Sequence, residues 1–315
     1  MTLAIGVDIG GTKIAAGLVS ESGKILDRSH EPTPDDSTKI PSVVADLVER
    51  LVGDEKAAGI GIGAAGFVGE DRATVRFAPN IDWREEPLAD HVRSLVNLPV
   101  VVENDANAAA WGEFRFGAGE DTDDLLLVTI GTGIGGGIVH KGQLFRGGFG
   151  VAAEIGHMRI VPNGILCGCG QHGCFEQYAS GSALVRDARE RVANGDDNAA
   201  ALAALADGDL SRITGPGITK LAQQGDPLSL ELLAEVGRWI GEGIAVLAAI
   251  LDPSVIAIGG GVAAAGDLLL PTVVEAFETH LPARAHRPEA SVRLAALGNE
   301  AGIIGAADLA RVEPA

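Results

Sequence analysis

Leu3-Ala-Ile-Gly-Val-Asp8-Ile-Gly-Gly-Thr-Lys13 is the stretch of this chain that decides the fold. An apolar run that ends in glycine predicts a β-strand entering a tight turn. The chain continues through the apolar segment 14–19, a polar turn at 21–24 and the pair Ile25-Leu26. Together these segments predict a β-meander. The same order of strand, glycine turn, strand and polar turn returns over 125–145, which suggests a duplicated domain.

Segments with helical spacing fill the space around the two meanders. We expect helices over 40–51, 86–96, 105–112, 182–192 and 199–205. The pattern over 228–251 fits one helix or two, 254–258 reads as a buried strand, and 298–307 as a closing helix. Strands that alternate with helices define an α/β fold. A length of 315 residues corresponds to about two domains, and we place their boundary near 107–112.

Charge and hydropathy exclude two classes of partner. The formal net charge of −19 argues against nucleic acid, whose binding requires a cationic face, and against an anionic membrane surface. The first residues lack the cationic start of a signal peptide, and uncharged apolar runs such as 243–251 are too short to span a bilayer. We therefore expect a cytoplasmic protein with no membrane or nucleic-acid partner.

Glycine is abundant, at 44 of 315 residues, and three glycine turns follow predicted strands directly. Backbone N–H groups in such turns can bind phosphate. The turn after Asp8 adds a carboxylate for Mg²⁺, the hydroxyl of Thr12 and the cation of Lys13; the other turns are 131–137 and 259–261. No Gly-x4-Gly-Lys-Ser/Thr motif occurs, and the Gly-x-Gly-x-x-Gly matches at 61–66 and 131–136 do not open helices, which disfavours Walker-type and dinucleotide sites.

The three cysteines, Cys167, Cys169 and Cys174, lie in one short segment. Disulfide pairing would leave one thiol over, whereas three thiolates and one further ligand make a tetrahedral zinc site. His157 and His172 both compete for the fourth position. Because four protein ligands leave no open position for water, the predicted metal is structural.

Polar residues follow the predicted strand 99–102 in the order Glu103-Asn104-Asp105-Ala-Asn107. A carboxylate at the end of a strand can act as a general base, and Asn-Asp can equally cap the following helix. Asn80, His157 and the carboxylates Glu154 and Glu176 suit the paired donors and acceptors of a sugar, although a lone surface carboxylate needs no such role.

These motifs together resemble the ROK family (repressors, open reading frames, kinases), and in particular its bacterial glucokinase branch. The resemblance covers nearly the whole chain, and its most specific part is the cysteine signature. It rests on 8–13, Pro79-Asn80-Ile-Asp-Trp83, 103–107, 131–137, 154–157, the cysteine segment through Glu176, 180–181, 259–261 and 298–302.

The resemblance implies two actin-like (ribonuclease H-like) α/β domains with a cleft between them that binds ATP and sugar. We expect an N-terminal domain over 1–108 with the last helix, about 300–315, packed back on it. A larger domain over 109–299 would carry the zinc loop. The implied activity is ATP-dependent phosphorylation of the glucose 6-hydroxyl, with Mg²⁺ and structural Zn²⁺ as cofactors.

The resemblance also assigns residues. Asp105 would be the catalytic base, and Asp8 would position Mg²⁺. His157 would bind zinc with one ring nitrogen and a sugar hydroxyl with the other, which favours it over His172. The implied sugar ligands are Gly66, Asn80, Asn104, Asp105, Glu154, His157 and Glu176. The implied nucleotide site comprises Asp8, Gly10, Gly11, Thr12, Lys13, Gly131, Thr132, Gly133, Gly259, Gly260 and Gly261.

Other activities remain open at this level. Sugar-responsive regulators of the family carry a helix-turn-helix domain before the Asp-x-Gly-Gly-Thr strand, which here begins at Leu3, so we expect a kinase. The zinc segment disfavours an actin-like ATPase without a sugar substrate. N-acetylmannosamine, N-acetylglucosamine, fructose and allose are alternative sugars, and polyphosphate an alternative donor. A homodimer or homotetramer is expected from relatives.

Overall fold

The computed structural model describes residues 2–53, 56–78 and 80–312. The chain forms two compact units. Unit 1 comprises Met1–Leu127, Gly136–Ala153 and Ala295–Ala315, and unit 2 comprises Val128–Gly135 and Glu154–Leu294. The chain therefore passes between the units four times.

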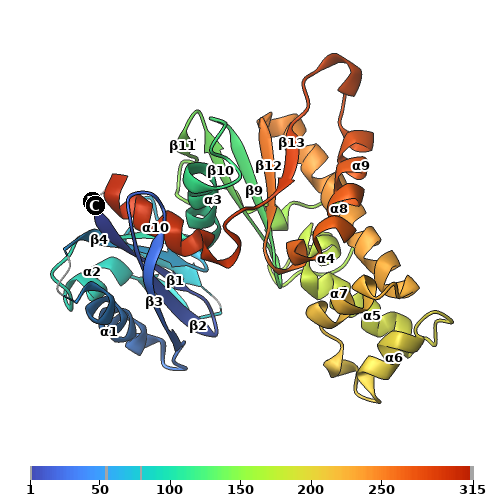
Figure 1. Cartoon of the computed structure of the whole chain (residues 1–315), viewed down its shortest axis with the longest axis horizontal. Coiled ribbons are helices and arrows are strands. Elements are labelled where there is room, and N and C mark those ends of the chain that lie inside the picture. The colour runs from blue at the N-terminus through green and yellow to red at the C-terminus, as the bar shows by residue number, and fades with distance from the viewer. Residues whose placement is uncertain (1, 54–55, 79, 313–315) are drawn as a thin grey trace. The chain divides into compact units, whose positions relative to one another are not determined.

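The first meander supplies three of the five strands of the sheet in unit 1, whose order is β3-β2-β1-β4-β8; the strands β1 to β4 are labelled in Figure 1. The strands are β1 (Leu3–Ile9), β2 (Lys13–Val19), β3 (Ile25–Pro32), β4 (Ala57–Ala64) and β8 (Val100–Asn104). β1 pairs antiparallel with β2 and parallel with β4. The predicted meander is confirmed, and it places Asp8 at the carboxyl end of the central strand.

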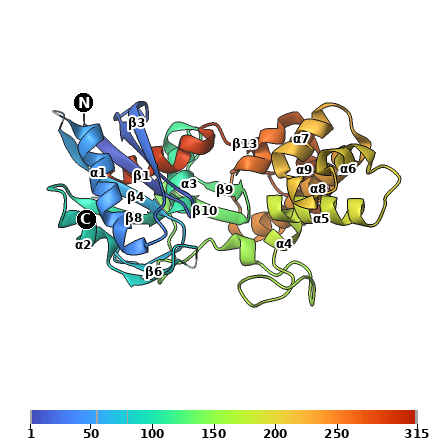
Figure 2. The ribbon, with the colours of Figure 1, turned by 90° about the horizontal axis from the view of Figure 1, so that it is seen from below.

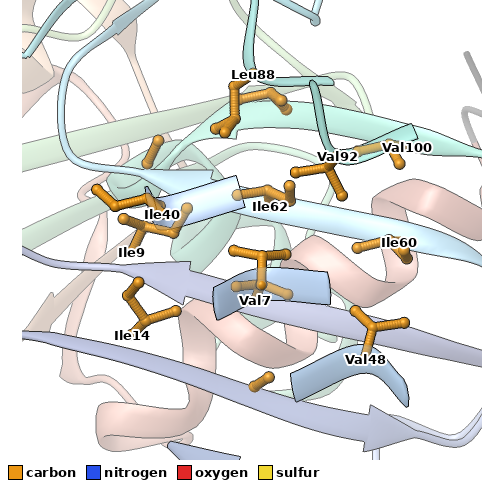
Figure 3. Packing of buried hydrophobic residues seen from close by; sticks show 14 of the residues in the cluster. Val7, Ile9, Ile14, Ile40, Val48, Ile60, Ile62, Leu88, Val92 and Val100 are labelled. Atoms are coloured by element: carbon orange, nitrogen blue, oxygen red, sulfur yellow. The ribbon is translucent and has the colours of Figure 1, made fainter. Parts of the chain in front are cut away.

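The two faces of this sheet are covered by different helices. The helices of unit 1 are α1 (Ile40–Val52), α2 (Leu88–Arg93), α3 (Asp105–Phe116) and α10 (Ala301–Val312), with short 3₁₀ turns at Ser37–Lys39 and Gly298–Glu300. Along β1, Val7 and Ile9 pack in one buried cluster with Ile40 and Val48 of α1 (Figure 3). Ala4, with the opposite side-chain direction, packs against α10 in a second cluster.

A small second sheet in unit 1 was not predicted. It consists of β5 (Phe67–Val68), β6 (Val75–Ala78) and β7 (Trp83–Glu86). Because β7 includes Glu86, the helix expected over 86–96 is shorter and begins at Leu88.

The predicted boundary between residues 108 and 109 falls inside α3, which belongs as a whole to unit 1. The physical reason is the packing of α3 on α10. The buried Asp308 of α10 accepts hydrogen bonds from Trp111 Nε1 and Arg115 Nη1 of α3, both at 2.9 Å. These bonds hold the middle of α3 in unit 1, and the division of the chain follows them.

The repeated pattern over 125–145 forms the strands β9 (Leu125–Ile130), β10 (Ile134–His140) and β11 (Gln143–Leu144). They belong to a five-stranded sheet of order β11-β10-β9-β12-β13, completed by β12 (Val255–Gly259) and β13 (Ser291–Leu294). The predicted second meander and the strand before the third glycine turn are both confirmed.

Apart from Val128–Gly135 and the strands β12 and β13, helices make up most of unit 2 (Figure 2). They are α4 (Glu176–Ala179), α5 (Gly181–Ala193), α6 (Ala200–Ala206), α7 (Gly215–Gln223), α8 (Pro227–Leu251) and α9 (Leu270–His280), with 3₁₀ segments at Ile155–His157, Leu210–Arg212, Gly261–Leu268 and Arg284–His286. The pattern that fitted one helix or two is the single helix α8, capped by the Asp226 side chain. Among the described residues, no helix combines the length and the apolar character that a bilayer crossing requires.

Candidate active site

Asn104 fixes the start of α3 and hence the position of Asp105. Its side-chain oxygen accepts a hydrogen bond from the Asn107 N–H at 3.0 Å, which makes it the N-cap. Its Nδ2 donates to the Gly66 carbonyl at 3.1 Å. The structure therefore brings together three predicted substrate residues, Gly66, Asn104 and Asp105, and also bears out the capping role for Asn104.

Asp105, the first residue of α3, lies near Asp8 at the end of β1. Burial, together with the negative charge of Asp105, raises the pKa of Asp8 to about 6, and the cation of Lys13 opposes the shift. Burial also raises the pKa of Asp105, against hydrogen bonds such as that from the Ala106 N–H. Two adjacent carboxylates of raised pKa suit a proton acceptor beside a cation site.

Glu103 supports this region from within the protein, a role that the sequence analysis missed. Its side chain is 3% exposed, and its Oε2 accepts from Arg146 Nε at 2.6 Å. Oε1 accepts from Asn107 Nδ2 at 3.0 Å and from the Asn104 N–H at 3.1 Å. The end of β8 is thus tied to the first turn of α3. No local sequence signal joins Glu103 to Arg146, which lies 43 residues further along the chain.

The first glycine turn, 10–13, is an ordered connection between β1 and β2. The Gly10 N–H donates to the Lys13 carbonyl at 3.0 Å, and Thr33 Oγ1 donates to the Gly10 carbonyl at 2.7 Å. Gly11, Thr12 and Lys13 are exposed. A Cβ at Gly11 would lie 3.7 Å from the Cβ of Asn80, so this predicted sugar ligand adjoins the turn. Pro79, quoted in the same motif, lies outside the described residues.

The predicted zinc ligands of unit 2 form a cluster. One ligand atom each from His157, Cys167, Cys169 and Cys174 lies within 4.8 Å of the others. Cys169 Sγ is 3.6 Å from Cys174 Sγ, and Cys167 Sγ is 3.7 Å from His157 Nδ1. A tetrahedral zinc with bonds of about 2.3 Å to sulfur separates its ligand atoms by about 3.8 Å. The donor set and its spacing therefore fit zinc.

His172, the competing histidine, does not belong to this cluster. Its Nδ1 lies 2.9 Å from the Gly164 carbonyl, and the residue is exposed. It pairs with Leu166 in an isolated β-bridge, which fixes the hairpin that carries the cysteines. Spacing along the sequence left both histidines open, and the geometry of the loop selects His157.

Protonation of the thiols depends on their surroundings. Burial, with the adjacent carboxylate of Glu176, raises the pKa of Cys167 to about 12, and burial also raises the pKa of Cys174. A hydrogen bond from the Gln171 backbone lowers the pKa of the exposed Cys169. Since metal ligands must be thiolates, binding a cation here would release protons from the two buried cysteines.

Glu176 connects the cluster with the second glycine turn. Its Oε1 is 3.0 Å from Cys167 Sγ and 3.7 Å from His157 Nδ1. A Cβ at Gly133 would lie 2.7 Å from its Oε2, so a side chain there would displace the Glu176 carboxylate. Glu154 precedes the 3₁₀ turn that carries His157, and its carbonyl accepts from the His157 N–H at 3.1 Å. Unit 2 therefore groups Glu154, His157 and Glu176, the three remaining predicted sugar ligands.

Unit 2 also contains a pocket of about 660 Å³. Its walls come from the second and third glycine turns, the first half of α5 and the first half of α7. Of the predicted nucleotide residues, Gly131, Thr132 and Gly261 line it. Gly260 turns the chain beside it with a φ of 84°, and a Cβ there would lie 2.5 Å from the Ile130 carbonyl. This conformation and close contact both require glycine.

The pocket contains residues that the sequence analysis did not identify. They are Gly181, Ser182, Leu184, Val185, Arg186, Arg189, Gly215, Pro216, Thr219 and Val262. The pair Ser180-Gly181 was part of the resemblance but received no role, and α7 was not predicted at all. A signal was present in Thr214-Gly-Pro-Gly, because a threonine cap followed by proline is typical of a helix start.

Three comparisons with known proteins agree. The family model described as "ROK family" matches residues 4–313. The glucokinase of Streptomyces coelicolor is 51% identical over 99% of this chain and 98% of its own length. An N-acetylmannosamine kinase of Escherichia coli is 34% identical over 99% of each chain. A crystal structure of a ROK family glucokinase from Streptomyces griseus, in complex with glucose and AMPPNP, is 53% identical, with a TM-score of 0.90 over 98% of this chain and 99% of that one.

The chain belongs to the ROK family. The α/β fold class inferred from the sequence is confirmed, since the chain matches ROK kinase structures over nearly its full length.

Proposed function

We propose that this protein is an ATP-dependent glucokinase, which transfers the γ-phosphoryl group of ATP to the 6-hydroxyl of glucose. The observation that carries the proposal is the similarity to the Streptomyces glucokinases along nearly the whole chain, including the one crystallised with glucose and AMPPNP. Phosphoryl transfer requires positioning and charge neutralisation more than covalent chemistry. The residues of both units supply groups for these tasks.

Asp105 is the proposed base. Its place at the start of α3 is fixed by the Asn104 cap and the buried Glu103, so the carboxylate has little freedom. When ionised, it accepts the proton of the sugar hydroxyl as that oxygen attacks phosphorus. Burial raises its pKa, which makes it a better proton acceptor than an ordinary aspartate.

The nucleotide would bind through the glycine turns and the pocket of unit 2. The pocket supplies Gly131, Thr132 and Gly261, with Gly133, Gly259 and Gly260 in the same turns. In unit 1 we assign phosphate binding to 10–13 and the positioning of Mg²⁺ to Asp8. Mg²⁺ would neutralise the charge that develops on the transferred phosphoryl group.

The sugar ligands proposed are Gly66, Asn80, Asn104, Asp105, Glu154, His157 and Glu176. Structural zinc would be held by His157, Cys167, Cys169 and Cys174, and when bound it would fix the loop that ends at Glu176. His157 turns Nδ1 toward Cys167, which leaves Nε2 as its other polar atom for a hydroxyl. Glu176 contacts both Cys167 and His157, so a cluster held by zinc would also hold this proposed sugar ligand in place.

A second candidate is a kinase for N-acetylmannosamine, favoured by the similarity to the Escherichia coli enzyme. An assay of ADP release over glucose, N-acetylmannosamine, N-acetylglucosamine, fructose and allose distinguishes the two. We expect the highest kcat/KM with glucose. A higher kcat/KM with N-acetylmannosamine would reassign the substrate, and sugar binding without ADP release would favour the non-enzymatic regulator.

We also propose that the protein binds only small-molecule partners, forms a homo-oligomer and is located in the cytoplasm, as expected from the sequence and the relatives. Light scattering of the full chain measures its mass in solution, which we expect to be that of a dimer or a tetramer. A monomeric mass at assay concentrations would contradict it.

A further inference from the structure

Arg189 of α5 is a residue of the unit 2 pocket with no role in the function proposed above. It lines the pocket. Its Nη2 donates to two backbone carbonyls, those of Ser211 and Ile213, each at 3.0 Å. One guanidinium nitrogen therefore holds both ends of a three-residue segment of a different element.

That segment leads directly into the opposite wall of the pocket. Thr214 follows it and caps α7, with its hydroxyl accepting from the Gly217 N–H at 3.3 Å. The first residues of α7, Gly215 and Pro216, line the pocket together with Thr219. Ile213 is fully buried, so the segment cannot shift at its inner end without disturbing the packing.

The remaining contacts of α7 are with other helices. It packs on α8, α5 and α6, and a Cβ at Gly217 would lie 2.9 Å from a methyl carbon of Leu205 on α6. Helix packing of this kind fixes the axis of α7, whereas the hydrogen bonds of Arg189 fix where the helix begins. The beginning of α7 is the part that faces the pocket.

We propose that Arg189 is a nucleotide-positioning residue, which holds the start of α7 as the wall for the nucleoside part of the phosphoryl donor. This inference rests on the proposed function and deepens it. The glycine turns can bind phosphate in any polyphosphate, but the α5–α7 wall offers Leu184, Val185 and Pro216 to an apolar ring. Arg189 thus favours a nucleoside triphosphate over inorganic polyphosphate.

The test compares the full-length Arg189→Met and Arg189→Lys variants with wild type. Arg191→Met is the matched control, because Arg191 lies on the same helix but bonds Asp196 and Glu231 and is not among the pocket residues. We measure KM for ATP and for glucose, and the inhibition constants of ADP and inorganic pyrophosphate. Thermal unfolding of each variant reports on folding.

In Arg189→Met we expect KM for ATP and the inhibition constant of ADP to rise about tenfold, or about 1.4 kcal/mol of binding. The glucose KM and the pyrophosphate inhibition constant should stay within about twofold, which is under 0.5 kcal/mol. Arg189→Lys should recover part of the loss, since an ammonium can donate to both carbonyls. Arg191→Met should match wild type.

Unchanged ADP inhibition in Arg189→Met would overturn the inference. An equal loss for ADP and pyrophosphate would also overturn it, because that result indicates a general disturbance of the pocket. If wild type phosphorylates no sugar, the proposed function fails; calorimetric titration with ADP then tests Arg189 alone, and a selective loss of ADP affinity would still support it.

Discussion

The two groups of predicted site residues are held in place by different means. In unit 1, Asp105 is positioned by a helix cap and by the buried Glu103, which accepts from Arg146 and from the first turn of α3. In unit 2, His157 and Glu176 are positioned around three cysteines whose geometry fits a metal. Hydrogen bonds of the folded chain hold the first group, whereas we expect a bound cation to hold the second. Chemistry and sugar recognition should therefore respond differently to metal loss.

Removal of the proposed base should have the largest effect on the chemical step. Asp105→Asn keeps the size of the side chain but cannot accept the proton, so kcat should fall by roughly 10²–10⁴-fold while the zinc content stays unchanged. Steady-state kinetics and elemental analysis measure both. Asp46→Asn, on the exposed face of α1, is the control. A variant that retains more than half of wild-type kcat would contradict the assignment.

The complementary test removes one metal ligand. His157→Asn should lose zinc and raise the glucose KM by roughly 10–100-fold, because Glu176 loses an ordered neighbour. His172→Asn is the matched control and should keep both values, since His172 lies outside the cluster. Elemental analysis should give about one zinc per chain in wild type and in the control. Equal zinc in both variants would show that His157 is not a ligand.

The pH dependence of kcat/KM tests the role of the two buried carboxylates in unit 1. Asp105 acts as a base only when ionised, and burial raises its pKa, as it raises that of Asp8 to about 6. As pH falls through these raised values, both carboxyls gain protons, so kcat/KM should decrease on the acidic side well above pH 4. Because the two groups are coupled, the apparent pKa belongs to the pair. A pH–rate profile that is flat down to pH 4.5 would refute this.

One prediction concerns stability and not catalysis. Glu113 is fully buried on α3, and its carboxylate accepts from the backbone N–H groups of Ala118, Ala296 and Leu297 at 2.7–2.9 Å. Glu113→Gln places an amide against these donors and should cost about 3 kcal/mol of unfolding free energy, with zinc content unchanged. The exposed pair of Arg28 and Glu300 is the reference, and Arg28→Met should cost less than about 0.5 kcal/mol. Chemical denaturation gives both values, and equal costs would contradict the buried role.

The sequence allowed the elements with strong local patterns to be predicted. Both meanders, α3 and α5 could be inferred because their apolar spacing, glycine turns and caps are contained within a few residues. The short strands β5–β7 could not, since two to four residues carry no measurable periodicity. The pairing of Trp111 with Asp308, which joins residues 197 positions apart, has no local signal that could guide the placement of a boundary near 108.

The same distinction applies to the site. The cysteine cluster is local, and its ligands could be identified from spacing, but only the loop geometry separates His157 from His172. Some contacts join residues from different elements, such as Glu103 with Arg146 and Arg189 with Ser211. The sequence around one member of such a pair does not predict the other. Such contacts require the fold. The resemblance to the ROK family supplied most of the individual sugar and nucleotide assignments.

The most direct test of the central claim is phosphorus NMR of the purified full-length protein with ATP, Mg²⁺ and glucose. We expect glucose 6-phosphate and ADP in equal amounts, with no ATP consumed when glucose is omitted. Release of inorganic phosphate in place of a sugar phosphate would identify an ATPase and would exclude a sugar kinase.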